Sequence, residues 1–419
     1  MARPEYDVAL YGATGFTGKL IAQYLASHPQ SPRVILAGRN KSKLELVREQ
    51  LRGITKDRLQ AITLMEATLN DPQSIKTLAS SAKVLINAVG PYTLHGGVQV
   101  AQAVAEVGGS YLDLTGETAV YAEMVEKVEP IAKQTNAIIV PSAGFDSLPF
   151  DLTTFLAVEE VKKVAGLEAE IGTVLLGYSL KAGMSGGTLG SAVAISEGPE
   201  ALRYTKPYWL SPIQGKQQLR LTLPYYVPQF NAYGANAIIT PHNTRVVNRT
   251  WGLLEQAKVP VRYGTSFRYN EARVNTSYLQ ALFSTVFLTL FALLLEYFRI
   301  IRFMAVKLLP PGQGPSLEQQ LNGYLEVRTL ASSRDGKVKG LVTFKTKGDP
   351  GYLKTAAFIS EAALAIAFNA ELLTPLAQQG GVVTPATLGA LILRERLTKF
   401  AGVVIHARDV TEMRNLHDI

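Results

Sequence analysis

The sequence lacks cysteine entirely and has only five histidines among its 419 residues. Without cysteine the chain cannot form a disulfide bond, a thiolate metal site or a cysteine nucleophile. The histidines are scattered and show no HxxxH spacing, so we expect no metal ion. A cleavable signal sequence is also not evident, because Met1–Glu5 lead straight into an apolar strand pattern.

Acidic residues are scarce in one long stretch of the chain. From Arg203 to Arg273 there are ten lysines and arginines against two acids, Glu255 and Glu271, an excess of eight positive charges. The net charge of the whole chain is also +8, so the remainder is near neutral. A basic stretch can bind nucleic acid, but no helix-turn-helix, RRM or zinc pattern accompanies this one. We therefore expect no nucleic-acid partner.

The strongest motif lies at the N-terminus. An apolar strand pattern at residues 6–11 runs into glycines at positions 12, 15 and 18, and a helical pattern follows. This order is typical of the first βα unit of a dinucleotide-binding domain, in which the turn and the helix N-terminus hold the pyrophosphate. Gly12 would allow the tight turn, Gly15 the approach of the backbone to the phosphates, and Gly18 close packing of the helix. The predicted cofactor-binding residues here are Gly12, Ala13, Thr14, Gly15, Phe16, Thr17 and Gly18.

The end of the second predicted strand, residues 33–37, indicates which dinucleotide binds. An NAD-binding domain usually has an acid there for the ribose 2′-hydroxyl, but the first acid after this strand is Glu45, well into the next helix. Arg39 and Asn40 follow the strand instead, and a guanidinium can hold a 2′-phosphate. We predict NADP(H), with Arg39 and Asn40 in its site. The alternative is an ordinary basic first turn of a surface helix.

The rhythm of apolar segments divides the chain into parts. Residues 1–150 alternate strands with helices, which predicts an α/β fold with a doubly wound parallel (Rossmann) sheet. Residues 151–385 predict a second, α+β domain that contains a hairpin at Asp335-Gly336 and an apolar segment at 279–309. Residues 386–419 are expected to form a C-terminal helix and tail that pack back on the Rossmann domain.

The apolar segment begins with a run, residues 279–295, that contains no charged residue and is about as long as the shortest bilayer span. Basic residues flank it: Arg268, Arg273, Arg299, Arg302 and Lys307. The basic stretch before it is rich in aromatic residues that suit a water–lipid interface: Tyr204, Tyr208, Trp209, Tyr225, Tyr226 and Tyr233. We predict attachment to the cytoplasmic face of a membrane or lipid droplet by an otherwise cytoplasmic protein. The alternatives are a buried helix, a homodimer interface and a true span.

Several motifs also occur in a characteristic order. They are Gly12–Gly18, Ala37–Arg39, Asn87–Tyr92, Tyr111–Glu117, Gly144–Ser147 and Gly380–Pro385. Together they resemble the saccharopine dehydrogenase-like oxidoreductases, which include the trans-acting enoyl reductases of mycobacterial lipid synthesis and a eukaryotic lipid-droplet-associated homologue. The resemblance covers most of the chain and implies the fold and the cofactor more firmly than the substrate.

Hydride transfer needs a proton donor or a stabiliser of developing charge beside the nicotinamide, beyond the carboxyl ends of the strands. Tyr92 and His95 are the predicted catalytic residues, because each carries a proton and follows the fourth predicted strand. A packed tyrosine ring and an exposed loop histidine are the alternatives. The residues of this loop expected to bind the cofactor are Asn87, Val89, Gly90, Pro91 and Tyr92.

Three acids follow the neighbouring strands. Asp113 and Glu117 are expected to make structural hydrogen bonds, and Asp146 to act as an N-cap or hinge, with an acid role as its alternative. Tyr121 has no lysine four residues later, which argues against the Tyr-x-x-x-Lys mechanism of short-chain dehydrogenases.

These observations predict an NADP(H)-dependent reductase that acts on an apolar small molecule or a carrier-bound acyl group. The resemblance implies that the reaction is reduction of the C=C of an enoyl thioester or a related lipid- or polyketide-like substrate. Two alternatives stay open. One is a saccharopine-type imine reductase, against which the hydrophobic segment counts because its substrate is fully polar. The other is a non-catalytic lipid-surface protein that binds NADPH.

Overall fold

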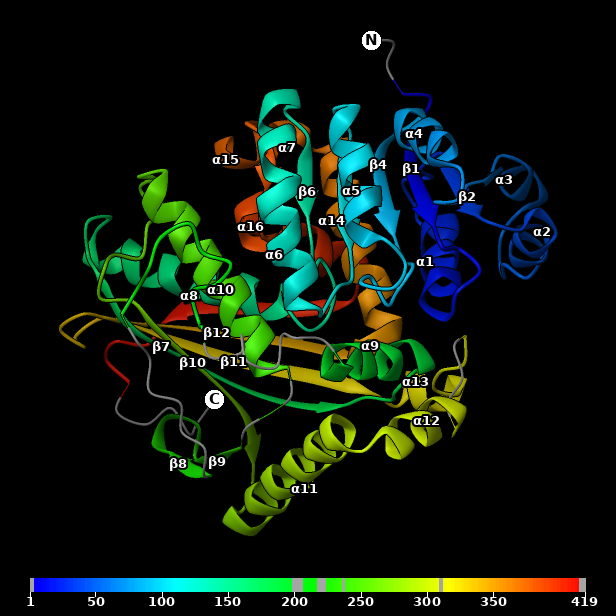
Figure 1. The fold of residues 1–419 in the computed structure, drawn as a ribbon. Helices are drawn as coiled ribbons and strands as arrows, with labels where there is room; N and C mark the ends of the chain where they lie inside the picture. Colours follow the sequence, from blue (N-terminus) through cyan, green and yellow to red (C-terminus); the bar gives the residue numbers. More distant parts are fainter. Residues whose placement is uncertain are drawn as a thin grey trace.

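The N-terminal part of the chain forms a sheet in which all strands are parallel (Figure 1). The computed structural model describes residues 4–197, 206–216, 224–235, 237, 239–308 and 312–413. Within them this first sheet has the order β13-β6-β5-β4-β1-β2-β3. Its strands are β1 (Tyr6–Tyr11), β2 (Val34–Gly38), β3 (Thr63–Glu66), β4 (Ala82–Asn87), β5 (Ser110–Asp113), β6 (Ile138–Val140) and β13 (Gly381–Val382). The change of direction between β1 and β4 confirms the doubly wound fold.

Helices cover both faces of the first sheet, because successive strand residues point to opposite sides. Val8 and Leu10 of β1 are buried in the layer that contains α1, α2 and α14, whereas Ala9 and Tyr11 are buried against α4 to α7. The helices are α1 (Phe16–Ser27), α2 (Lys41–Glu49), α3 (Lys56–Gln60), α4 (Pro72–Ser81), α5 (Gly97–Glu106), α6 (Thr118–Lys127), α7 (Glu129–Thr135) and α14 (Thr355–Phe368).

The second sheet is mixed and has the order β14-β12-β11-β7-β10-β9-β8. Only β7 and β10 pair in parallel among its described neighbours. The β11–β12 hairpin turns at Gly336, whose φ of 73° suits the predicted Asp-Gly turn. The strands are β7 (Ile171–Lys181), β8 (Tyr225–Val227), β9 (Ala232–Ala235), β10 (Arg268–Asn275), β11 (Tyr324–Ser333), β12 (Lys339–Lys347) and β14 (Val403–Asp409).

Helix α8 lies across β11 and β12, and α10 and α16 pack beside it. Figure 1 shows α11 and α12 on the side of the second sheet away from α8, with α9 between them and the first domain. The longer helices of this part are α8 (Leu148–Ala165), α9 (Gly186–Glu197), α10 (Thr240–Gln256), α11 (Tyr278–Tyr297), α12 (Arg299–Leu308) and α16 (Pro385–Phe400). The short ones are η2 (Pro228–Phe230), α13 (Leu317–Leu321), η3 (Pro350–Lys354), η4 (Ala370–Leu372) and α15 (Pro375–Gln378).

The C-terminal part of the chain returns to both sheets, which differs from the predicted boundaries. α14 and β13, expected in the domain 151–385, belong to the first sheet and its layer. β14, from the expected tail 386–419, is instead an edge strand of the second sheet. The reason is that α14 carries apolar side chains on all sides, with Glu361 as its one charged residue, and is covered by the first sheet and by α16. Residues 414–419 lie outside the described residues.

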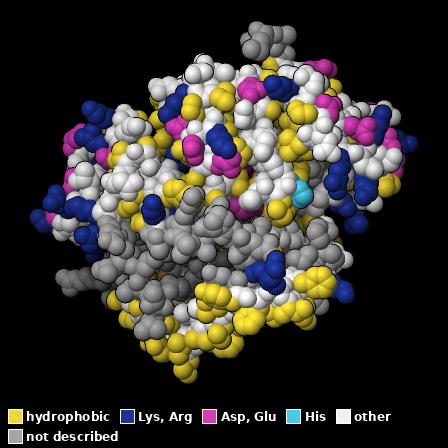
Figure 2. Space-filling model, viewed as in Figure 1, with side chains coloured by type: hydrophobic (Ala, Val, Ile, Leu, Met, Phe, Trp, Pro, Cys, Tyr) yellow, Lys and Arg dark blue, Asp and Glu magenta, His cyan; other side chains and the backbone are white. Residues whose placement is uncertain are grey.

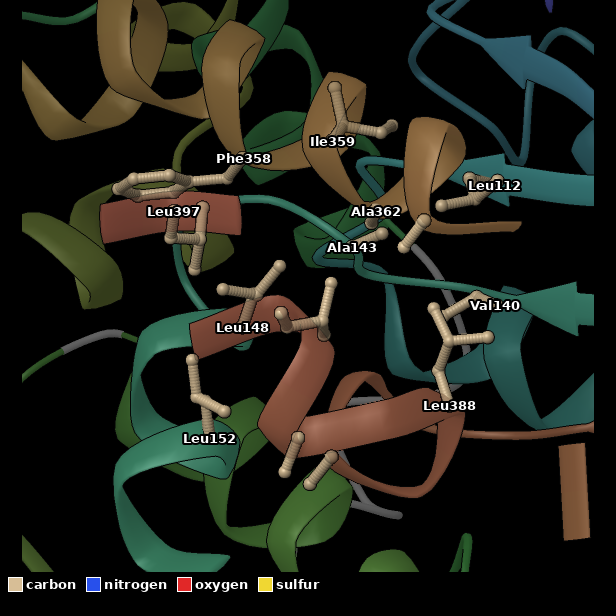
Figure 3. Close-up of a cluster of buried hydrophobic side chains, with 14 of the residues drawn as sticks. Leu112, Val140, Ala143, Leu148, Leu152, Phe358, Ile359, Ala362, Leu388 and Leu397 are labelled. Atoms are coloured by element: carbon tan, nitrogen blue, oxygen red, sulfur yellow. The ribbon is translucent and has the colours of Figure 1, made fainter. Parts of the chain in front are cut away.

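Figure 3 shows the hydrophobic cluster that joins these parts. It brings together Leu112 of β5, Val140 of β6, Leu148 and Leu152 of α8, Phe358, Ile359 and Ala362 of α14, and Leu388 and Leu397 of α16. Because one core contains side chains from both domains, the floor of any site between the domains is held rigidly.

A buried ionic group lies in the same layer. The carboxylate of Glu361 on α14 accepts hydrogen bonds from the hydroxyl of Tyr24 at 2.6 Å and from Arg396 Nε at 2.9 Å, and His28 Nε2 lies 3.0 Å away. Glu361 is fully buried, and its partners lie on α16 and at the end of α1. Such a group is costly to break, because removal of one partner leaves the others buried without a counter-charge.

The basic stretch before α11 does not form a single charged surface. Arg245 and Arg249 of α10 are buried, where Arg249 donates to the carbonyl of Val382 and pairs with Glu129. Tyr208 is also buried, against Trp251. These side chains hold the domain together instead of facing lipid. Tyr204 lies outside the described residues.

The apolar segment predicted at 279–309 forms two helices, α11 and α12, which meet at Phe298. Two described stretches are long and apolar enough to cross a bilayer: Tyr278–Leu295, of which 17% is buried, and Pro350–Phe368, of which 72% is buried. The second is the core helix α14. α11 is different, because most of its apolar surface faces outward (Figure 2).

Candidate functional site

The glycine turn lies at the carboxyl edge of the first sheet, between β1 and α1. Gly12 has a φ of 89°, in the left-handed region that favours glycine. A Cβ atom on Gly18 would lie 2.1 Å from the carbonyl oxygen of Gly12, so glycine is required for this close approach. Gly15 is the N-cap of α1, and no side chain caps the helix. The first N–H groups of α1 are therefore available to a phosphate at the positive end of the helix.

A cavity of about 1460 Å³ opens over this turn. It runs from the turn and Arg39, past the loops that follow β4 and β6, to α9 and α11. Pockets for one drug-sized ligand are about 300–1,000 Å³, so this cavity has room for a dinucleotide and a substrate together. The predicted site residues that line it are Gly12, Thr14, Gly15, Phe16, Thr17, Arg39, Val89, Gly90, Tyr92 and His95.

Five residues predicted to bind the cofactor are not part of this lining: Ala13, Gly18, Asn40, Asn87 and Pro91. Two of them shape the loops that do line it. Asn87 accepts the N–H of Val89 at 3.0 Å, and Asn40 caps α2 by accepting the N–H of Lys43 at 2.9 Å. Both amide oxygens thus accept from the protein's own backbone, and the amide nitrogen of Asn87 donates to the hydroxyl of Tyr111 at 3.1 Å.

The two predicted catalytic residues differ in their surroundings. Tyr92 is buried, and its hydroxyl donates to the carbonyl of Asn87 and accepts from the N–H of Leu114, both at 3.0 Å. Burial raises the pKa of this hydroxyl well above its usual value. The geometry favours the packing role for Tyr92, since its hydroxyl already donates one hydrogen bond and accepts another within the protein. His95 is exposed at the wall of the cavity.

Asp113 and Glu117 make the structural hydrogen bonds that the sequence predicted. Glu117 accepts the N–H groups of Tyr92 and Thr93, each at 2.9 Å, which fixes the loop after β4. Asp113 accepts the N–H groups of Thr115 and Ser142, also at 2.9 Å. Burial raises the pKa of Asp113 to about 6, although these hydrogen bonds act in the opposite direction.

Asp146 lies in the wall of the cavity, on the loop between β6 and α8. The N-cap of α8 is Ser147 and no side chain caps the helix, so the capping role expected of Asp146 is not found. Among the described residues its carboxyl group has no side-chain partner, and burial raises its pKa to about 6. Its φ of 47° is uncommon for a residue with a side chain, and such backbone strain is frequent at functional sites.

His242, at the start of α10, also lines the cavity and was not predicted as a site residue. Its Nδ1 lies 2.9 Å from the hydroxyl of Thr118, and its Nε2 lies 3.0 Å from that of Ser142. The Ser142 hydroxyl donates to the carbonyl of Thr115, so Nε2 must donate to Ser142 and Nδ1 must accept from Thr118. Burial lowers the pKa of His242 to about 3, which keeps the ring neutral.

This histidine joins the second domain to the loops of the first. Its partners are 124 and 100 positions away in the chain. No local pattern around Pro241-His242 signals such contacts, and this explains why sequence reasoning missed it.

The cavity therefore combines a glycine turn at a helix N-terminus, the guanidinium of Arg39 and a carboxyl group without a side-chain partner among the described residues. Residues 8–140 match the family of the saccharopine dehydrogenase NADP binding domain. A Mycobacterium tuberculosis protein named as a trans-acting enoyl reductase is 34% identical over 420 residues, which cover 95% of this chain and 96% of the relative. The chain belongs to the saccharopine dehydrogenase-like oxidoreductases, in the group of the trans-acting enoyl reductases.

Further comparisons agree with this membership. A trans-acting enoyl reductase of Mycobacterium bovis is 32% identical over 425 residues, 96% of this chain and 98% of that protein. The apo saccharopine dehydrogenase of Saccharomyces cerevisiae has the same fold, with a TM-score of 0.52, 13% identity, and coverage of 97% of this chain and 100% of that one. This oxidoreductase is NADP-dependent, which confirms the cofactor predicted from the missing acid after β2.

Proposed function

We propose that this NADP-dependent oxidoreductase reduces the carbon–carbon double bond of an enoyl thioester or a related lipid- or polyketide-like substrate. One observation carries the proposal. A single cavity joins the glycine turn and Arg39 to the carboxyl group of Asp146, which has no side-chain partner among the described residues, and then to the apolar helix α11. The substrate is an apolar small molecule or a carrier-bound acyl group, in keeping with the names of the mycobacterial relatives.

The glycine turn, Arg39 and the loop after β4 would hold the cofactor. The turn is built for close approach, since a Cβ atom on Gly12 would lie 2.6 Å from Cγ2 of Val89 and one on Gly18 2.1 Å from the carbonyl oxygen of Gly12. Reduced nicotinamide supplies a hydride when bound. Saturation of the double bond also requires a proton, at the carbon next to the thioester carbonyl. Asp146 can hold that proton, because its pKa of about 6 is close to the working pH and its side chain faces the cavity. Water then returns a proton to the carboxylate.

The test is NADPH consumption with a panel of enoyl thioesters and amino-acid imines. We expect turnover with thioesters. Asp146→Asn should lower kcat by roughly 10²–10⁴-fold without weakening the binding of NADPH. Asp335→Asn, in the β11–β12 turn, is the matched control and should change neither kcat nor the affinity for NADPH. Oxidation of NADPH with imines but not with thioesters would support the saccharopine-type alternative. NADPH binding without turnover on any substrate would support the non-catalytic alternative.

We also propose that α11 and α12 attach the protein to the cytoplasmic face of a membrane or a lipid droplet. Figure 2 shows hydrophobic side chains gathered along the edge formed by α11. Phe283 is 72% exposed and Phe287 57%, and on α12 Ile300 and Phe303 are also more than half exposed. So much contiguous apolar surface marks an interaction site. Exposed Arg299 and Lys307 on α12 favour an anionic lipid partner.

Flotation with anionic liposomes tests this attachment. Replacement of Phe283, Phe287, Leu290 and Leu294 with serine should release a folded, NADPH-binding protein, because all four side chains are exposed. The matched control replaces four equally exposed leucines elsewhere, Leu46, Leu167, Leu372 and Leu391, and should still float. The lipid attachment is rejected if the wild type does not float. If the wild type then sediments as a dimer and the α11 variant as a monomer, the apolar face of α11 is a homodimer interface instead.

A further inference from the structure

Helix α11 has a second role that its exposed face does not explain, because its other face is a wall of the cofactor cavity. Phe291, Ala292 and Leu295 line the same cavity as the glycine turn and Asp146. Leu295 is 4% exposed and faces inward. Ala292 is exposed as well as part of the lining, so the cavity opens to the outside beside it. Phe291 of the lining stacks on the ring of exposed Phe287, so the outer apolar face of α11 continues into the cavity at this point.

Helix α9 spans the distance between α11 and the loop after β4. A Cβ atom on Gly190 would lie 3.3 Å from Cγ of Pro91, so α9 packs directly on that loop. The Ser191 hydroxyl donates to Glu117 at 3.0 Å, the carboxylate that also holds the loop. α9 in turn packs on α11 and α12 (Figure 1).

The side chains that α9 turns to the cavity are small: Gly187, Thr188, Ser191 and Ala192. A passage lined by such residues leaves room for a narrow, unbranched group between the polar cofactor end and the apolar end at α11. An alkyl chain has this shape and this polarity. The chain would leave the cavity where α11 faces lipid, and would not cross water.

We infer that the passage along α9 holds the alkyl chain of a long-chain acyl substrate, which enters from the lipid surface through the opening beside Ala292. This inference rests on the proposed enoyl reductase function. It adds that α11 is both the lipid-contacting element and the wall that accepts the acyl chain. The thioester group lies at the Asp146 end of the cavity. The space between α9 and α11 then determines which lengths of acyl chain fit.

The test compares Ala292→Trp, which narrows the opening, with Leu293→Trp, its neighbour on α11 that is not part of the lining. For Ala292→Trp, kcat/KM for a hexadecenoyl thioester should fall roughly tenfold or more relative to that for crotonyl thioester, as a change of pocket shape can produce. Leu293→Trp should leave the ratio of the two unchanged. An equal effect of Ala292→Trp on both chain lengths would overturn the inference and leave the proposed reduction intact.

A binding measurement separates the two proposals. Calorimetric titration with palmitoyl-CoA needs no turnover, and Ala292→Trp should weaken binding roughly tenfold while Leu293→Trp does not. If no enoyl thioester is reduced but this loss is seen, the reductase function fails and the acyl passage stands. If palmitoyl-CoA binds both variants equally, the passage is refuted.

The entry route has its own readout. Hexadecenoyl thioester is presented either free in solution or within vesicles of phosphatidylcholine and phosphatidylserine. Changing Phe283 and Phe287 to serine should slow turnover of the vesicle-borne substrate only. Equal slowing of both forms would contradict entry from the lipid surface.

Discussion

Reversal of the charge at Arg39 tests how the protein selects NADP(H) over NAD(H). Arg39 follows β2 directly, is exposed, and lines the cavity that begins at the glycine turn. Glu66, which pairs in register with Gly38, accepts the N–H of Lys41 and so faces the start of α2. Arg39→Asp would therefore place a carboxylate where we predict that the 2′-phosphate binds.

The magnitude follows from two effects. Loss of a charge-assisted hydrogen bond costs about 1.5–3 kcal/mol. Repulsion between the new carboxylate and the phosphate adds about 1 kcal/mol, the value for charges about 4 Å apart in water, since the side chain is exposed. The sum, about 2.5–4 kcal/mol, corresponds to roughly a 60- to 700-fold weaker NADPH affinity. NADH has no 2′-phosphate, so its affinity should stay the same or improve.

Fluorescence titration of both cofactors measures these affinities. Arg39→Ala should show the first effect only, and Arg52→Asp, an exposed charge reversal away from the cavity, is the control. Added salt should reduce the preference of the wild type for NADPH, because exposed charges are screened. The reasoning is refuted if Arg39→Asp binds NADPH as the wild type does, or loses both cofactors equally.

Three further variants test the remaining assignments. Tyr92→Phe should lower the melting temperature, because it removes the hydroxyl partner of the Asn87 carbonyl and the Leu114 N–H, at about 1–3 kcal/mol for each group. Turnover per folded molecule should stay within severalfold of the wild type. A loss of turnover of roughly 10²-fold or more would instead support Tyr92 as the proton donor. For the wild type, kcat/KM should fall as the pH rises through about 6, because the Asp146 carboxyl loses its proton there; a pH profile of Asp146→Asn that keeps this limb would remove the assignment. Glu361→Gln should destabilise the fold by about 3–5 kcal/mol in a denaturant titration, and an unchanged midpoint would show that its buried partners need no counter-charge.

Local patterns predicted those parts of the protein that contiguous residues build. The turn from β1 to α1 needs glycine at Gly12 and Gly18 for conformational and steric reasons that arise within a few residues of chain. α16 begins with Thr384 as the capping residue and Pro385 in the first turn, a signal that two neighbouring residues supply. The same holds for the hairpin at Gly336.

Predictions about side-chain roles depended on contacts that a local pattern does not contain. Whether the Tyr92 hydroxyl faces a substrate or the backbone is decided by Leu114, 22 positions later. The domain boundary at 385 differed because β13 and β14 have only two and seven residues and find their partners in different sheets. Short strands carry little periodicity from which such pairing could be read.

The sequence by itself determined the nucleotide-binding domain and the choice of NADP(H), because glycine geometry, helix capping and the charge after a strand act over short distances. Only the tertiary structure decided what stands opposite the nucleotide. His242 lines the cavity and is held there by the hydroxyl groups of Thr118 and Ser142, which lie 124 and 100 positions away in the chain. An apolar run such as α11 shows that a helix needs apolar contacts, but not which of its faces is exposed and which closes a cavity. That choice depends on how the second sheet and α9 pack against the first domain.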